Sequence, residues 1–225
     1  MTWIKICGTT NLEDAQAAVD AGADALGFVF YDRSPRNTDA DTARKIVAEL
    51  PRGVEKVGVF VNQSLEEVQA VAKEAGFTGV QLPAHLYASR TADLLRLKNE
   101  LPQLKVIMTY SVPKVIEGGS LLISADAQKI IHALMLDSGN AAPPGGTGKT
   151  FDWESAQALV LGANLMLPVI VAGGLTPSNV GEAIDLFQPW GVDVVSGVES
   201  GPGKKDPQKV RAFVKAVRDA DKAVE

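Results

Sequence analysis

Two side chains that can move protons stand at the ends of short apolar runs in this chain. Cys7 ends the run Trp3–Cys7, and Asp137 directly follows the run Ala133–Leu136. A thiol near a positive charge ionises more readily and then accepts protons from carbon acids. A carboxyl in an enclosed site keeps its proton to a higher pH and can act as a general acid. The pair therefore suggests a reaction that removes one proton and delivers another.

The alternation of side chains along a strand places Cys7. Lys5 and Cys7 share one face of their run, and Ile4 and Ile6 share the other. We expect the aliphatic pair to pack against helices, so that Lys5 and Cys7 face the opposite side. A small buried hydrophobe is an equally good interpretation of a lone cysteine. Asp137 could likewise be a cap or a turn former, although no helix is predicted until Asp152.

Glycines follow the last two apolar runs, Pro168–Ala172 and Asp193–Ser196. Glycine lets the backbone approach a ligand closely, and exposed N–H groups bind anions. Two tight turns would also explain the glycines, but their occurrence after consecutive runs favours a phosphate site. The residues predicted to form this site are Gly173, Gly174, Ser196, Gly197, Val198 and Glu199.

A second glycine-rich segment, 145–150, is not a nucleotide P-loop. That motif requires glycine five residues before Gly148, where this chain has Pro143. The segment belongs to the long loop Ser138–Thr150, which we interpret as a mobile lid. We predict that the loop contacts the substrate through Gly146, Gly148 and Lys149.

Arg36 lies in the loop after the run Ala25–Phe30. Its planar guanidinium suits two-pronged binding of a carboxylate. By itself, the pattern favours a solvated loop arginine instead.

These residues must be positioned by a repeating set of elements. Eight apolar runs, several of them nearly continuous, are typical of strands buried on both faces. Amphipathic stretches separate them, including Ser64–Ala75, which opens with a capping box. The predicted strands are Trp3–Cys7, Ala25–Phe30, Val54–Val61, Gly79–Leu82, Lys105–Thr109, Ala133–Leu136, Pro168–Ala172 and Asp193–Ser196. The predicted helices are Leu12–Ala21, Asp39–Leu50, Ser64–Ala75, Arg90–Leu101, Lys114–Gln128 (broken or short), Trp153–Leu161, Asn179–Phe187 and Pro207–Ala220.

A strand–helix unit that recurs about every 28 residues predicts an α/β protein of one domain, residues 1–225. We expect a single (β/α)8 TIM barrel, a closed parallel sheet of eight strands, rather than an open doubly wound sheet. In such barrels the active site forms where the strands end.

Composition excludes several classes. A net charge of −5 does not suit nucleic-acid binding. One cysteine and two histidines exclude an intramolecular disulfide and a Cys/His zinc cage. We find neither a membrane span nor a signal-peptide pattern, and therefore expect a cytoplasmic protein without metal.

Taken together, these features resemble phosphoribosylanthranilate isomerases, barrel enzymes of tryptophan biosynthesis. The resemblance runs in colinear order over nearly the whole chain. The matching segments are Lys5–Thr10, Gly27–Phe30, Ser34–Arg36, Gly58–Asn62, Leu136–Ser138, Gly146–Trp153, Ala172–Leu175, Ser196–Ser200 and Gly203–Asp206.

The resemblance implies an Amadori rearrangement of N-(5-phosphoribosyl)anthranilate to the 1-deoxyribulose 5-phosphate aminoketose, with no cofactor. It implies that Asp137 is the general acid and that Cys7, as thiolate, removes the C2 proton. It also implies that Arg36 binds the anthranilate carboxylate and that the last two strand-end loops bind phosphate. We further expect Lys5 to help lower the pKa of Cys7, and a monomer or a homodimer.

The end of the fourth predicted strand departs from the family pattern. Family members carry Gln-Leu-His-Gly there, but this chain has Pro83 at the histidine position and His85 two residues later. In an extended chain that is a shift of about 6 to 7 Å. Two alternatives stay open: a related phosphosugar barrel, such as an indole-glycerol-phosphate synthase or another aminoaldose isomerase, and a retired barrel that binds an anion without turnover.

Overall fold

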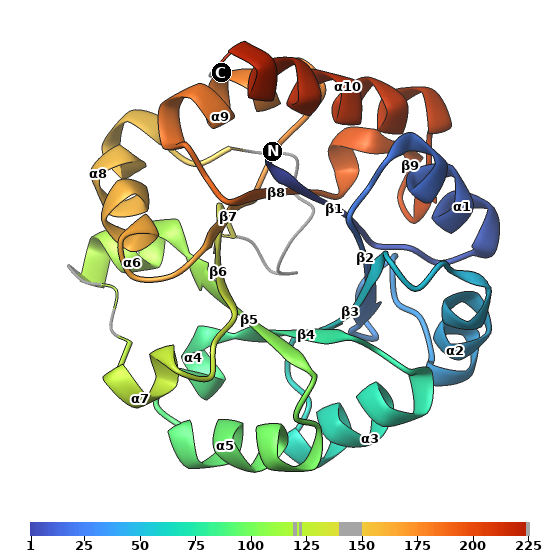
Figure 1. The fold of residues 1–225 in the computed structure, drawn as a ribbon, viewed down its shortest axis with the longest axis vertical. Coiled ribbons are helices and arrows are strands. Elements are labelled where there is room, and N and C mark those ends of the chain that lie inside the picture. The colour runs from blue at the N-terminus through green and yellow to red at the C-terminus, as the bar shows by residue number, and fades with distance from the viewer. Residues whose placement is uncertain (119–120, 122, 140–149, 224–225) are drawn as a thin grey trace.

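A computed structural model describes residues 1–118, 121, 123–139 and 150–223 of the chain. Eight parallel strands close into a barrel in chain order, and helices surround it (Figure 1). The predicted (β/α)8 barrel is therefore confirmed. The strands are β1 (Trp3–Cys7), β2 (Ala25–Phe30), β3 (Glu55–Phe60), β4 (Gly79–Pro83), β5 (Lys105–Ser111), β6 (Ala133–Asp137), β7 (Val169–Val171) and β8 (Gly191–Val194).

The barrel closes between the first strand and the last. β1 pairs with β8 in a register that sets Lys5 opposite Asp193 and Ile6 opposite Val194. The prediction for β8 was wrong by two residues, because the strand starts at Gly191 and ends before the 3-10 turn η1 (Ser196–Val198). The other seven strands start within one residue of their predicted bounds and end within two.

Most helices also match their predictions. The capping box is confirmed, since the Ser64 side chain accepts a hydrogen bond from the Glu67 backbone N–H and the Glu67 carboxylate accepts one from the Ser64 N–H. The helices that match a predicted stretch are α1 (Leu12–Ala21), α2 (Ala40–Glu49), α3 (Leu65–Ala75), α5 (Thr91–Glu100), α8 (Trp153–Asn164), α9 (Val180–Phe187) and α10 (Pro207–Ala223).

The remaining elements differ from the predictions. The stretch Lys114–Gln128 is broken, with α6 (Val112–Gly118) starting before it and α7 (Ala125–Gln128) ending it. A short helix, α4 (Ala84–Tyr87), follows β4 directly. After η1, an antiparallel hairpin of β9 (Glu199–Gly201) and β10 (Lys204–Lys205) leads into α10. Alternation patterns do not predict elements this short.

Two apolar layers hold the barrel together. Ile4 and Ile6 belong to the large cluster between strands and helices, as predicted. A smaller cluster fills the barrel interior, and Trp3 and Trp190, stacked with ring centres 5.0 Å apart, pack against it. The buried interior residues are Ala25, Val57, Ile107, Ala133, Met135, Ile170 and Ala172. Among the described residues, no helix is long and apolar enough to cross a membrane.

Candidate active site

A pocket opens where the strands end. It contains roughly 830 Å³ of empty space, part of which is continuous with solvent. Cys7 from β1, Asp137 from β6 and Arg36 from the loop after β2 all line it. Sequence reasoning had placed Cys7 and Asp137 at strand ends and Arg36 in the loop after the second strand, and the structure brings all three to one cavity.

Cys7 lies deep in this pocket, with 4% of its surface exposed. Lys5 lies on the same face of β1, fully buried, and its Nζ is 2.7 Å from Asp193 Oδ1. Burial raises the pKa of the Cys7 thiol, and the positive charge of Lys5 opposes that effect without overcoming it. The expectation that Lys5 lowers the pKa of Cys7 is thus right for its own contribution and wrong for the net shift.

Gly27 makes the space that the thiol occupies. It is the register partner of Cys7 on β2. A Cβ atom at Gly27 would lie 2.6 Å from Cys7 Sγ and 3.0 Å from Lys5 Nζ. Only glycine therefore fits at this position without displacing the thiol.

Asp137 ends β6 and lines the same pocket. Its Oδ1 accepts hydrogen bonds from the Gly139 N–H at 3.0 Å and from the Ser138 hydroxyl at 3.3 Å. Burial raises the pKa of the Asp137 carboxyl, and the nearby negative charge of Asp193 raises it further. These two effects outweigh the hydrogen bonds, so the environment suits a proton donor.

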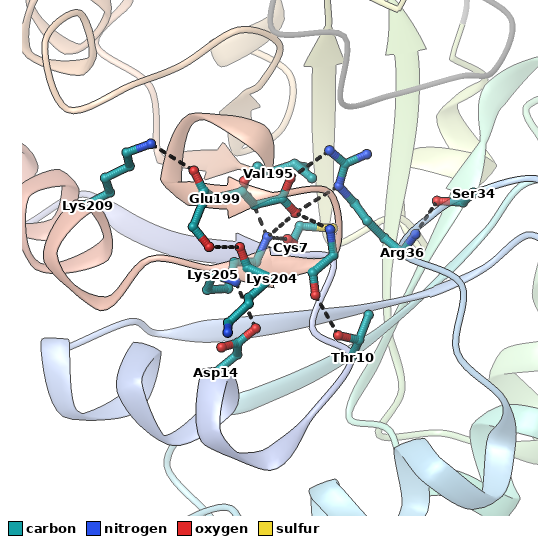
Figure 2. A network of polar contacts seen from close by, with 12 residues as sticks. Cys7, Thr10, Asp14, Ser34, Arg36, Val195, Glu199, Lys204, Lys205 and Lys209 are labelled. Atoms are coloured by element: carbon teal, nitrogen blue, oxygen red, sulfur yellow. Dashed lines mark hydrogen bonds and ion pairs between the residues drawn. The ribbon is translucent and has the colours of Figure 1, made fainter.

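Arg36 is held by a buried acidic side chain. Its Nε donates to Glu199 Oε1 at 2.9 Å, and its Nη2 donates to Glu199 Oε2 at 2.7 Å. Figure 2 shows Arg36 and Lys205 converging on this carboxylate, with Lys205 Nζ 3.0 Å from Oε1. Burial alone would raise the pKa of Glu199, but Arg36 and Lys205 lower it overall.

Lys205 also ties this cluster to Cys7. Its Nζ donates to the backbone carbonyl of Cys7 at 2.5 Å and to that of Val195 at 3.3 Å (Figure 2). The side chain is fully buried, and burial lowers its pKa. Sequence reasoning included Lys205 in a matching segment but assigned it no role, because its neighbours in the chain do not reveal its contact with the Cys7 carbonyl, 198 residues away.

The two glycine turns meet at a smaller pocket beside the first. Gly173, Gly174 and Ser196 line it together with Asp137 and Asp193. Gly173 and Gly174 have φ angles of +92° and +68°, which favour glycine.

The turns after β7 and β8 also pack tightly. A Cβ at Gly197 would lie 2.0 Å from the carbonyl oxygen of Leu175. The Val198 side chain is fully buried, and the Glu199 carboxylate binds Arg36 and Lys205. At Val198 and Glu199, therefore, only the backbone is available to bind a phosphate.

Pro83 and His85, the two residues at the departure from the family pattern, both reach the main pocket. Pro83 ends β4 and His85 lies exposed in α4, and both line the cavity. The helical turn, which was not predicted, brings His85 to the pocket. Sequence reasoning also missed Asp193, whose only signal was an acid inside an apolar run. Gly146, Gly148 and Lys149 lie outside the described residues.

Comparison with known proteins agrees with this geometry. A family model described as N-(5'-phosphoribosyl)anthranilate (PRA) isomerase matches residues 4–216. N-(5'-phosphoribosyl)anthranilate isomerases from Chlorobaculum tepidum and Geotalea uraniireducens are 42% and 41% identical to this chain. They cover 100% and 97% of the chain, and the alignments span 98% and 99% of those proteins.

Solved structures agree as well. The phosphoribosyl anthranilate isomerase of Thermotoga maritima matches with a TM-score of 0.79 and 37% identity, over 97% of this chain and all of that one. A phosphoribosyl anthranilate isomerase in complex with reduced 1-(o-carboxyphenylamino)-1-deoxyribulose 5-phosphate matches with a TM-score of 0.76 and 35% identity, over the same shares. This chain belongs to the N-(5'-phosphoribosyl)anthranilate isomerase family.

Proposed function

We propose that this protein isomerises N-(5-phosphoribosyl)anthranilate to 1-(2-carboxyphenylamino)-1-deoxyribulose 5-phosphate in tryptophan biosynthesis, with Cys7 and Asp137 as catalytic residues. One observation carries the assignment of roles: a thiol and a carboxyl with a raised pKa face the same pocket from β1 and β6. A barrel that had lost its activity would have no need to keep both groups there. The reaction is an isomerisation and needs no external oxidant.

The chemistry begins at Asp137. Its proton passes to the furanose ring oxygen as the bond from that oxygen to C1 breaks, and the nitrogen lone pair forms the C1=N bond of a Schiff base. The Cys7 thiolate then removes the proton on C2, and that electron pair forms C1=C2 while the C1=N pair returns to nitrogen. The enolamine then takes up a proton at C1 and loses the proton of its C2 hydroxyl, which gives the ketone. The thiol that Cys7 became can return the first proton and the Asp137 carboxylate can accept the second, so that both groups regain their starting states. Lys5 and Lys205 favour the thiolate, and burial opposes it.

Binding is proposed to use both ends of the pocket. Glu199 occupies the Nε side of the Arg36 guanidinium, so the substrate carboxylate would bind at its Nη1 edge. The phosphate would bind the turns of the smaller pocket, through Gly173, Gly174, Ser196, Gly197 and the backbones of Val198 and Glu199. The loop before α8 would contact the substrate through Gly146, Gly148 and Lys149.

The same proposal extends to the setting of the enzyme. We expect residues 1–225 to act as one catalytic domain in the cytoplasm, as a monomer or a homodimer. One solved structure is described as that of monomers generated from the dimeric phosphoribosylanthranilate isomerase of Thermotoga maritima. That structure matches with a TM-score of 0.75 and 34% identity.

Turnover of freshly made phosphoribosylanthranilate tests the activity. Substrate and product have equal mass, so they are separated by chromatography and compared with a sample that lacks the enzyme. Enzyme-dependent appearance of the aminoketose supports the proposal. If the substrate decays at the same rate in both samples, the proposal is wrong.

A further inference from the structure

The wall formed by β4 and β5 presents two neutral polar side chains to the main pocket. Gln81 and Thr109 both line the cavity. Gln81 pairs in register with Ile107, and Thr109 lies two residues further along β5. Their Cα atoms are therefore diagonal neighbours, about 8 Å apart. β4 and β5 lie across the barrel from β8 and β1 (Figure 1).

Both side chains contain a buried atom without a partner. Gln81 Oε1 and Thr109 Oγ1 are shielded from solvent and form no hydrogen bond with any described residue. Gln81 is only 9% exposed. A buried polar atom left unpaired is destabilising, and native proteins rarely keep one without a functional reason. Two such atoms on neighbouring strands of one pocket point to a ligand.

The chemistry of these atoms selects the ligand group. An amide oxygen only accepts hydrogen bonds, whereas a threonine hydroxyl both donates and accepts. An alcohol satisfies both, because it can donate to Gln81 Oε1 and accept from the Thr109 hydroxyl. A carboxylate or phosphate cannot donate to Gln81, and cationic or glycine-rich sites for anions lie elsewhere in the cavity.

We infer that Gln81 and Thr109 bind a hydroxyl group of the sugar portion of the substrate. This inference rests on the proposed function and adds a sugar-binding wall to it. The contact orients the sugar between the two anionic ends, so that C2 faces Cys7 and the ring oxygen faces Asp137. Good orientation of the reacting atoms contributes directly to rate.

The test is Thr109→Val, which keeps the shape of the side chain and removes its hydroxyl. We expect kcat/KM for phosphoribosylanthranilate to fall at least about tenfold, because the sugar loses a buried hydrogen bond. The melting temperature should stay the same or rise, because an unpaired buried group is removed. Thr109→Ser restores the hydroxyl and should keep kcat/KM within about threefold of wild type.

Thr38→Val is the matched control. Thr38 Oγ1 is also buried and unpartnered among the described residues, but Thr38 does not line the pocket. It should keep wild-type kcat/KM. A loss of kcat/KM in Thr109→Val but not in Thr38→Val distinguishes a substrate contact from a structural role.

Binding measurements separate this inference from the proposed function. Thr109→Val and Gln81→Met should weaken binding of the reduced aminoketose phosphate, which contains the sugar chain, and leave binding of anthranilate unchanged. If wild type turns over and Thr109→Val keeps its kcat/KM and its affinity for the analogue, the inference is wrong. If wild type fails to turn over, the proposed function is wrong, and the binding of the analogue still decides the role of Thr109.

Discussion

Lys5 and Asp193 form a buried ion pair between register partners on β1 and β8, with Lys5 Nζ 2.7 Å from Asp193 Oδ1. Both charges act on both groups, but Lys5 has the larger effect on the Cys7 thiol and Asp193 has the larger effect on the Asp137 carboxyl. Lys5 opposes the rise in the pKa of Cys7, and Asp193 adds to the rise in the pKa of Asp137. One ion pair therefore supplies each proposed catalytic group with a neighbour of the sign that its role requires.

The pKa of Cys7 can be measured directly, because Cys7 is the only cysteine in the chain. Burial outweighs the positive charge of Lys5, so the thiol should ionise at a higher pH than a free cysteine. The pH dependence of alkylation by iodoacetamide gives the midpoint, with Cys7→Ser as the unreactive control. A midpoint at or below that of free cysteine would contradict the role assigned to burial.

Asp137→Asn should stabilise the protein relative to wild type, and this difference should grow as the pH rises. The folded-state pKa of Asp137 lies above its ordinary value, so ionisation of this group opposes folding. The wild-type contribution is favourable at low pH and is lost as the pH passes through the raised pKa. Asparagine never ionises, and its oxygen can still accept from Gly139 and Ser138. The melting temperature of the variant minus that of wild type should therefore grow from pH 4 to pH 8, and a constant or shrinking difference would count against the raised pKa.

Gly27→Ala should damage activity through Cys7. The new methyl group would need the space 2.6 Å from Sγ, so the thiol must move. A displacement of this size at a reacting atom can reduce kcat about 100-fold. Gly162→Ala is the matched control, since Gly162 lies in α8 with no atom within 4 Å of the added Cβ. Steady-state kinetics should give a lower kcat for Gly27→Ala than for Gly162→Ala. Equal kcat values would mean that Gly27 does not position the thiol.

Glu199→Gln should affect both stability and substrate binding. It leaves the fully buried Lys205 without its ionic partner, which typically costs about 3–5 kcal/mol. It also weakens the pair of hydrogen bonds that holds the Arg36 guanidinium, so KM for phosphoribosylanthranilate should rise. Chemical denaturation and kinetics measure the two effects. Glu66→Gln, which removes an exposed ion pair with Arg96, should change neither. If Glu199→Gln keeps wild-type KM, Glu199 does not position Arg36.

Local patterns in the sequence predicted much of this architecture. The alternation in Trp3–Cys7 placed Lys5 and Cys7 on the inner face, and β1 confirms it, because side chains in a strand point to opposite faces in turn. The apolar run Ala133–Leu136 placed Asp137 at the end of the sixth predicted strand, and β6 ends at Asp137. Such patterns depend only on neighbours in the chain.

Contacts between distant segments were not predictable in this way. Lys5 meets Asp193 across 188 positions, and Lys205 meets the Cys7 carbonyl across 198. A charged residue in the chain does not reveal which opposite charge will neutralise it. The short helix α4, which brings His85 to the pocket, has only one turn and leaves too little periodicity to recognise. The offset of β8 arose because the Ser–Gly–Val sequence after it fits a strand end and a 3-10 turn equally well.

The central claim is that Cys7 and Asp137 are the base and acid of one isomerisation. Steady-state turnover of phosphoribosylanthranilate by wild type, Cys7→Ser and Asp137→Asn tests it most directly. We expect wild type to be active, and each variant to lose about 100-fold to 10,000-fold in kcat while keeping its fold by circular dichroism. An inactive wild type, or full kcat in both variants, would contradict the account.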